Sequence, residues 1–215
     1  DETHVIDKFL LPSGTRFIAG VDWGYTNPCC ILVLAVTPDQ GIYLVHEFYK
    51  TQQRIGQMVE MAKKLKDLYG IEMFHCDPSS PSNIVEFNSA GCIALAADNE
   101  IRAGVDACYE LIKSGKFHVF KDTAPNFVDE VSTYHYPEDK NVTPDKNVKD
   151  ALPVKQDDHS MDAFRYPIYA LKTSKMMRKS IPYDHERIDT KEAFSHSDRD
   201  IKKLMRRLDT DDYDG

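Results

Sequence analysis

The sequence lacks the cysteine spacing that a disulfide framework or a structural zinc site requires. No two cysteines are separated as Cys-x-x-Cys, and their number, five, is odd: Cys29, Cys30, Cys76, Cys92 and Cys108. We therefore expect neither a disulfide framework nor a structural zinc site, and the cysteine usage favours a reducing, cytosolic setting. With 215 residues, 41% of them hydrophobic, the chain is long enough to bury a core without disulfides or a structural metal.

Long hydrophobic runs and a secretory signal are also missing. Residues 1–8 are polar and mixed in charge, which is not typical of a signal peptide. The longest apolar run, at 29–36, is far too short to span a bilayer and predicts a buried strand instead. We expect no membrane association.

The chain has no excess of positive charge. Lys and Arg number 27 against 35 Asp and Glu, a net charge of −8. This excludes a protein coated in basic patches, and it predicts that any attraction to nucleic acid is local. Acidic metal ligands would add to such a count, and bound cations would offset them. A phosphate-binding loop of the form Gly-x-x-x-x-Gly-Lys-Ser/Thr is absent as well.

The hydrophobic pattern predicts a mixed sheet with helices on both faces, which is an α/β fold. Apolar runs joined by short turns cover residues 16–22, 29–37 and 42–49, and predict an antiparallel three-strand meander. Strand-like and helical periods then alternate. The further expected strands are 71–76, 91–97 and 117–120, and the expected helices are 55–69, 81–87, 101–113, 126–134 and 157–171.

Composition divides the chain into a lead-in at 1–14, one core domain at 15–172 and a polar tail at 173–215. Inside the core, residues 137–153 are charged and rich in proline, which predicts a loop or exposed hairpin. The tail contains one amphipathic stretch, at 201–208. That stretch is either a solvated, partly helical tail or a docking helix for a partner or nucleic acid.

Two aspartates stand at the ends of predicted strands. Asp22 ends the first strand of the meander and is followed by Gly24, where the missing side chain would let a ligand approach the backbone. Asp77 ends the strand at 71–76, and Pro78 favours an extended conformation for it. Taken singly, each aspartate is as well explained by a turn. Together they indicate a site at the strand ends, where α/β sheets place their ligands.

A third acidic group lies in the segment 157–162. On a helix, Asp158 and His159 would share a face with Asp162, at spacings of four and three residues. Like charges repel at that spacing, and a divalent cation would reverse the sign of the interaction. Helix-dipole stabilisation in a first turn is the alternative explanation. It accounts for Asp157 and Asp158 better than for Asp162, which lies about a turn further in.

Separated carboxylates of this kind suit phosphodiester hydrolysis. The reaction needs a nucleophilic water, a neutralised phosphate and a stabilised leaving oxygen, and two hard cations roughly 3.5–4 Å apart can supply all three. Mg²⁺ and Mn²⁺ take oxygen ligands, so carboxylates rather than thiolates are expected around them.

Three stretches resemble a known family. They are GVDWGYTNP at 20–28, HCDPSSP at 75–81 and DDHSMDAFRY at 157–166. In this order they are similar to the nuclease domain of the large terminase subunit of tailed bacteriophages, within the ribonuclease H-like superfamily. The similarity covers roughly 15–172, and the last stretch, with its His-x-x-Asp-Ala pattern, is the most specific.

The resemblance implies a metal-dependent endonuclease that cuts concatemeric viral DNA during genome packaging in the host cell cytoplasm. It implies Asp22, Asp77 and Asp162 as the ligands of two Mg²⁺ or Mn²⁺ ions, with Asp158 as an alternative or additional ligand. His159 would stand beside the metals as a neighbour of the ligands or a proton donor. The implied partners are double-stranded DNA, an ATPase motor in the same longer chain, the portal and the small terminase subunit. Since no phosphate loop occurs here, we expect the cutting part without ATP hydrolysis.

Three rival interpretations remain. Actin-like ATPases and sugar kinases begin with a similar strand, but they need two such lobes and a second phosphate motif. A junction resolvase or an RNA–DNA hybrid nuclease would share the acidic residues, so substrate preference would have to separate them. A non-catalytic module that binds DNA or the portal would be expected to have lost part of the set, whereas Asp22, Asp77 and Asp162 are all present.

Overall fold

The computed structural model describes residues 4–135, 152–154 and 157–173. The strands are β1 (Val5–Ile6), β2 (Arg16–Asp22), β3 (Cys29–Val36), β4 (Ile42–Lys50), β5 (Met73–Cys76), β6 (Ala94–Ala96) and β7 (Phe117–Phe120). The helices are α1 (Ile55–Tyr69), α2 (Pro81–Ser89), α3 (Ile101–Lys113), α4 (Pro125–Thr133) and α5 (His159–Thr173). The tail with its amphipathic stretch, and nearly all of the expected loop at 137–153, lie outside the described residues.

The strands form one mixed sheet in the order β1-β7-β4-β3-β2-β5-β6. The antiparallel meander of β2, β3 and β4 is confirmed. On one side β5 joins β2 in parallel and β6 joins β5, and on the other side β7 joins β4. The strand β1 completes the far edge by pairing with β7, so part of the expected lead-in belongs to the sheet.

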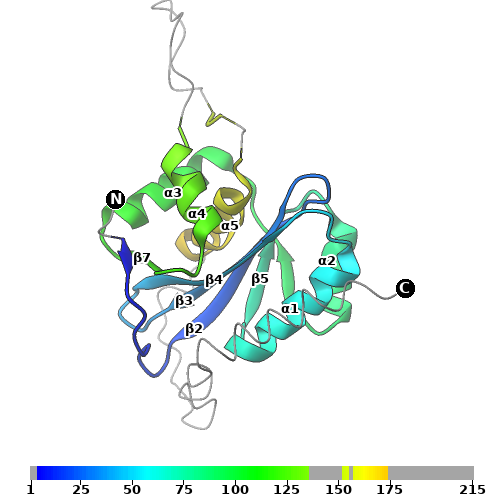
Figure 1. Ribbon diagram of the computed structural model, residues 1–215, viewed down its shortest axis with the longest axis horizontal. Coiled ribbons are helices and arrows are strands. Elements are labelled where there is room, and N and C mark those ends of the chain that lie inside the picture. The colour runs from blue at the N-terminus through cyan, green and yellow to red at the C-terminus, as the bar shows by residue number, and fades with distance from the viewer. Residues whose placement is uncertain (1–3, 136–151, 155–156, 174–215) are drawn as a thin grey trace, which may run out of the picture.

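Helices cover both faces of this sheet, as expected, with α1 and α2 on one side and α3, α4 and α5 on the other (Figure 1). Side chains alternate between two cores because successive residues of a strand point to opposite faces. Along β2, Ala19 and Val21 enter the core under α1 and α2. Ile18 enters the core under the other three helices. Asp22 continues that second series and therefore points toward the α5 face.

Most element ends follow the local signals in the sequence. The bounds of α3 and β7 agree with the prediction. The helix α1 ends at Tyr69, and the next residue, Gly70, has a φ of 68°, a left-handed conformation that suits glycine. Pro81 begins α2 as predicted, and the side chain of the preceding Ser80 accepts no capping hydrogen bond. The last helix begins at His159, two residues later than expected, so Asp158 precedes it.

The position that sets the helix against the sheet is Gly20, in the middle of β2. A Cβ atom built there would lie 1.7 Å from the carbonyl oxygen of Ala163 and 2.8 Å from Cδ of Pro167, both on α5. Pro167 has no N–H, so the Ala163 carbonyl lacks its helical donor and faces the strand instead. Glycine therefore allows α5 to pack directly on β2. Within the described chain, no helix has the length and apolar character needed to cross a membrane.

Candidate active site

Asp22 and Asp77 lie beside each other at one edge of the sheet. Their strands β2 and β5 are parallel neighbours in which Val21 pairs with Cys76, so the residue that follows each pair is an aspartate. The N–H of Asp77 donates to the carbonyl of Val21 at 2.9 Å, which extends the ladder to the site. Ser79 donates to the Asp77 carboxylate through its backbone N–H and its hydroxyl. The two strand-end aspartates predicted from the sequence are thus brought together.

The first residue of α5, His159, contacts Asp22 directly. Its Nδ1 lies 3.1 Å from Asp22 Oδ2. An ionised carboxylate can only accept, so Nδ1 carries the proton in this pair. The hydrogen bond and the charge of Asp22 raise the pKa of His159 above its usual value, against the opposing effect of burial. His159 therefore pairs with a strand-end carboxylate that is 137 residues away in the sequence.

Asp22 is a carboxylate in an unfavourable environment. Only 7% of the residue is exposed. Burial raises its pKa to about 6, and the negative charges of Asp162 and Asp77 add to the rise, while His159 lowers it. Burial and the charges of the same three aspartates also raise the pKa of Tyr166, on α5. Asp77 and Asp162 are therefore close enough for their charges to act on Asp22, and all three aspartates act on Tyr166.

Asp162 lies one turn into α5 and is paired within the helix. Its Oδ1 accepts from Nε and Nη2 of Arg165, at 3.2 and 2.8 Å. The Asp162 side chain is 20% exposed, whereas that of Arg165 is almost completely buried. The ion pair accordingly has one accessible and one inaccessible partner.

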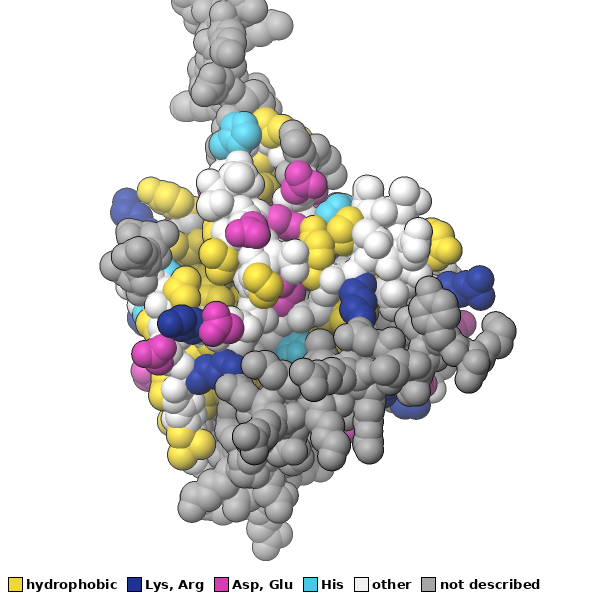
Figure 2. Space-filling view, viewed as in Figure 1, with side chains coloured by type: hydrophobic (Ala, Val, Ile, Leu, Met, Phe, Trp, Pro, Cys, Tyr) yellow, Lys and Arg dark blue, Asp and Glu magenta, His cyan; other side chains and the backbone are white. Residues whose placement is uncertain are grey.

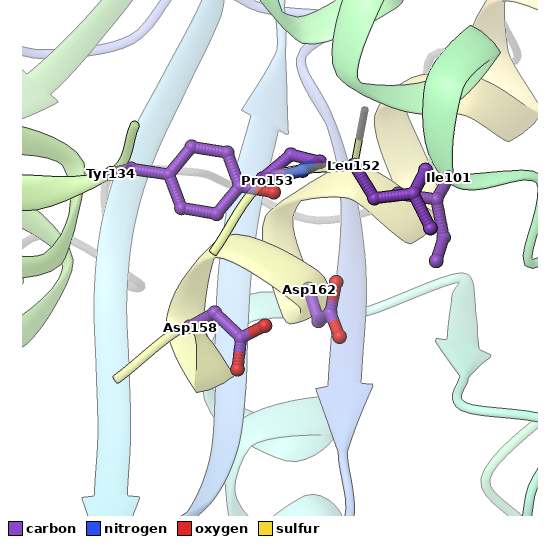
Figure 3. A pocket seen from close by; sticks show the side chains of 6 residues that line it. All are labelled: Ile101, Tyr134, Leu152, Pro153, Asp158 and Asp162. Carbon is purple, nitrogen blue, oxygen red and sulfur yellow. The ribbon is translucent and has the colours of Figure 1, made fainter. Parts of the chain in front are cut away.

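Asp158 caps the start of α5 through its backbone, because its carbonyl accepts from the N–H of Asp162 at 2.8 Å. Both aspartates line a pocket of about 110 Å³, along the side opposite Tyr134, Leu152, Pro153 and Ile101 (Figure 3). The pocket thus combines apolar walls with two carboxylates. Asp158 lies next to Asp162 as the sequence suggested, although it precedes the helix rather than sharing its face.

Glu130, on α4, holds the beginning of α5 and was not predicted from the sequence. Its Oε2 accepts from the N–H groups of Ser160 and Met161, at 2.7 and 3.2 Å, and from the Ser160 hydroxyl. Its Oε1 accepts from the hydroxyl of Tyr49 at 2.7 Å. A buried carboxylate from another element therefore satisfies the first-turn N–H groups of the helix that carries His159 and Asp162.

A second carboxylate, Glu47 on β4, does the same for α4. It accepts from the N–H groups of Asn126 and Phe127, at 3.0 and 2.7 Å, and from the Asn126 side chain. Glu47 and Glu130 therefore connect the sheet to α4 and α4 to α5 in series. The available sequence signal was an acidic residue within an apolar strand, beside Val45 and Phe48.

Neighbouring residues of the strand ends serve packing. Trp23 donates from Nε1 to the carbonyl of Asp77 at 2.8 Å and lies edge-on to Phe87, so it braces the strand ends. Burial lowers the pKa of His75 to about 4, which makes it a neutral strand residue at neutral pH. Space at Gly24 is taken by the chain itself, since an added Cβ would meet the carbonyl oxygens of Pro28 and Asn27. The expectation that the missing side chain of Gly24 leaves room for a ligand was therefore wrong, because the following turn fills that space.

The donor set fits a hard divalent cation in its chemistry. The three aspartates supply oxygen ligands, and burial, with a further contribution from the charges of Asp162 and Asp77, raises the pKa of Asp22. Acidic side chains also gather in the upper middle of the face seen in Figure 2. Among the described residues, however, no three Asp, Glu, His or Cys side chains are already positioned around one ion. Arg165, His159 and Ser79 each engage one of the aspartates, so side-chain adjustment would accompany metal binding.

No protein-family model and no curated protein sequence matches the chain. Solved structures do. A large terminase from a thermophilic bacteriophage matches with a TM-score of 0.69 and 20% identity, over 81% of this chain and 43% of that one. The P22 large terminase nuclease domain matches with a TM-score of 0.65 and 22% identity, over 82% of this chain and 92% of that domain.

The nuclease domain of the large terminase g2p of bacteriophage SPP1, solved with bound Mn, matches with a TM-score of 0.58 and 17% identity, over 79% of this chain and 96% of that one. The chain thus spans less than half of the large terminase from the thermophilic phage but nearly all of the isolated nuclease domains. The described part of the chain has the ribonuclease H-like fold of large terminase nuclease domains.

Proposed function

We propose that this chain is the nuclease part of a large terminase and that it cuts concatemeric viral DNA during packaging in a Mg²⁺- or Mn²⁺-dependent reaction. The observation that carries the proposal is the proximity of three aspartates in this fold: Asp22 and Asp77 at the ends of the neighbouring strands β2 and β5, and Asp162 on α5 close to Asp22. The Mn bound in the SPP1 nuclease domain supports the choice of cation.

Asp22, Asp77 and Asp162 would hold the cations, with Asp158 as a further ligand at the pocket. Bound divalent cations supply a nucleophilic water and neutralise charge on the phosphate. His159 keeps Asp22 oriented through Nδ1, so the other ring nitrogen, Nε2, is the one that exchanges a proton. The buried carboxylates of Glu130 and Glu47 fix α5 against the sheet and thereby hold His159 and Asp162 in place.

The proposed partners follow from the same assignment. Double-stranded DNA is the substrate, and an ATPase motor in the same longer chain moves it. The portal and the small terminase subunit would bind the assembled protein. The net charge of −8 predicts that DNA is held through local contacts and cations rather than a broad basic surface.

Plasmid cutting tests the proposal. Wild-type protein is incubated with supercoiled plasmid and Mn²⁺, Mg²⁺ or EDTA, beside Asp22→Ala, Asp77→Ala and Asp162→Ala. We expect cutting only with a metal and its reduction to background in each variant, since each loses a ligand. Asp67→Ala, which removes an exposed carboxylate on α1, is the matched control and should cut like wild type.

Full cutting by the three alanine variants, or cutting in EDTA, would contradict the proposal. Thermal unfolding of each variant in EDTA separates loss of chemistry from loss of folding. RNA–DNA hybrids and four-way junctions offered in the same assay test the rival nuclease classes, and preferential cleavage of either would replace the packaging assignment.

A further inference from the structure

Arg165 donates two hydrogen bonds to one oxygen of Asp162. The guanidinium donates through Nε and Nη2, and both contacts end on Oδ1, at 3.2 and 2.8 Å. The pair therefore fixes the carboxylate while Oδ2 takes no part in it. Arginine is suited to this role because its N–H groups form a rigid planar fork, whereas lysine offers one freely rotating ammonium group.

Arg165 is itself held from three directions. Asn99, just before α3, accepts from Nη2 at 2.7 Å. Gly104 leaves room for the side chain, since a Cβ there would lie 2.7 Å from Cγ and 2.8 Å from Cδ of Arg165. The ring of Tyr166 lies 4.8 Å from the guanidinium carbon. The direction of the fork is thus set by α3 and α5 together.

Packing alone does not explain a charged residue at this position. The Arg165 side chain is 3% exposed, and within the described chain its Nη1 is buried with no hydrogen-bond partner. Burying a guanidinium with an unpaired N–H disfavours folding, and an apolar side chain would avoid that cost. The same two helices are also joined at the surface by Lys172 and Glu110, at 2.7 Å, so they do not depend on Arg165 for an ion pair.

We infer that Arg165 is a positioning residue for metal binding. It fixes Oδ1 of Asp162 so that the carboxylate presents Oδ2 to a divalent cation, and Asn99 fixes Arg165 in turn. The inference rests on the proposed metal-dependent nuclease. It goes beyond that proposal by assigning a role to two residues that are not among the proposed metal ligands.

The test compares Arg165→Lys and Asn99→Ala with wild type, and Lys172→Ala serves as the matched control on the same helix. Calorimetric titration with Mn²⁺ in the absence of DNA gives the dissociation constant. Plasmid cutting over a range of Mn²⁺ gives the half-saturating concentration and the maximal rate separately. Unfolding in EDTA reports the stability of each metal-free variant.

Loss of a residue that orients a metal ligand typically weakens metal affinity by about 10- to 100-fold. We expect a loss in that range for Arg165→Lys, a smaller loss for Asn99→Ala and none for Lys172→Ala. The half-saturating Mn²⁺ concentration should rise in parallel, with a smaller change in maximal rate. A merely structural role would lower stability in EDTA without moving the affinity of the folded protein.

The two proposals fail in different ways. Wild-type protein that binds no Mn²⁺ overturns both. Wild-type protein that binds Mn²⁺ and cuts, beside a folded Arg165→Lys of equal affinity, overturns the positioning role alone. Should Arg165→Lys fail to fold, Asn99→Ala decides, because the Asn99 side chain is exposed and hydrogen-bonds to Arg165. Unchanged affinity in that variant then overturns the role.

Discussion

At the scale of single residues, the main feature of the site is Asp22, whose ionised form is unfavourable in the metal-free protein. Asp22 is buried beside two other aspartates, and its pKa of about 6 lies well above the ordinary value of 3.8. His159 offsets part of this cost through its hydrogen bond. A residue in this state gains stabilisation from a cation, which is the expected condition of a metal ligand before the metal binds.

The raised pKa predicts how stability depends on pH. A group whose pKa is higher in the folded protein contributes stability that is complete below about 3.8 and lost as pH rises through about 6. Asp22→Asn imitates the protonated form. In EDTA it should therefore be more stable than wild type at pH 7.5, by up to about 3 kcal/mol, and the difference should shrink toward pH 4. His159 loses its charged partner in the variant, which reduces the gain.

Denaturant unfolding at several pH values measures this difference. Asp67→Asn makes the same charge change at an exposed position and is the control. If Asp22→Asn proved less stable than wild type at pH 7.5, the hydrogen bond to His159 would outweigh the cost of burying the charge.

At the scale of elements, the series from Glu47 to α4 and from Glu130 to α5 fixes the helix that carries the site. Each carboxylate is buried and accepts from the first-turn N–H groups of a helix, and in α4 the residue before the helix, Ala124, offers no side-chain cap of its own. The helix dipole makes a negative charge favourable at both places. Besides the backbone contact at Gly20, side chains that lie outside the predicted site therefore help to fix the position of α5.

Glu130→Gln tests this connection. The amide retains one acceptor oxygen, but it places an NH₂ group among donors and removes the charge that faces the helix end. We expect a loss of roughly 2–3 kcal/mol in the free energy of unfolding, measured by denaturant titration. Asp129→Asn, at the exposed neighbouring position, should change it by less than about 0.5 kcal/mol. Equal losses in the two variants would count against a capping role.

The sequence predicted most elements because their signals are local. Gly70 ends α1 and Pro81 begins α2 through conformational preferences of single residues, and β3 is recognisable as a continuous apolar run. By contrast, β1 has two residues, too few for any period. Glu130 caps a helix from 30 residues away and Glu47 does so from about 80, and neither arrangement leaves a spacing pattern in the sequence.

The site was predicted only in part, because some of its features have local signals in the sequence and others depend on long-range packing. Asp22 and Asp77 mark strand ends, and the parallel pairing of β2 with β5 brings them together. The contact between His159 and Asp22 depends on how α5 crosses the sheet, which side-chain packing decides. The pairing of Asp162 with Arg165 follows a common three-residue helical spacing, but its burial depends on Gly104 of another helix.

At the scale of the whole molecule, a cation that binds only the folded chain raises its stability. With Mn²⁺ at about 100 times its dissociation constant, the gain is about 2.7 kcal/mol. For a domain of this size that corresponds to a rise of roughly 5–10 °C in the melting temperature. The rise should be absent in Asp22→Ala and reversed by EDTA, and NaCl at matched ionic strength is the control. An equal rise in Asp22→Ala would locate the binding elsewhere.

The contact at Gly20 has a consequence for the charges near it. The strand and α5 touch there through the backbone atoms of Gly20 and Ala163. Gly20 lies two residues before Asp22, and Ala163 directly follows Asp162. Like-charged groups on a looser scaffold would separate until their repulsion faded. Here the spacing is set by steric contact, which is far stiffer than electrostatic repulsion, so the aspartates stay close whether or not a counter-charge is present. The fold thereby keeps an electrostatic strain at the site, which a bound cation would relieve.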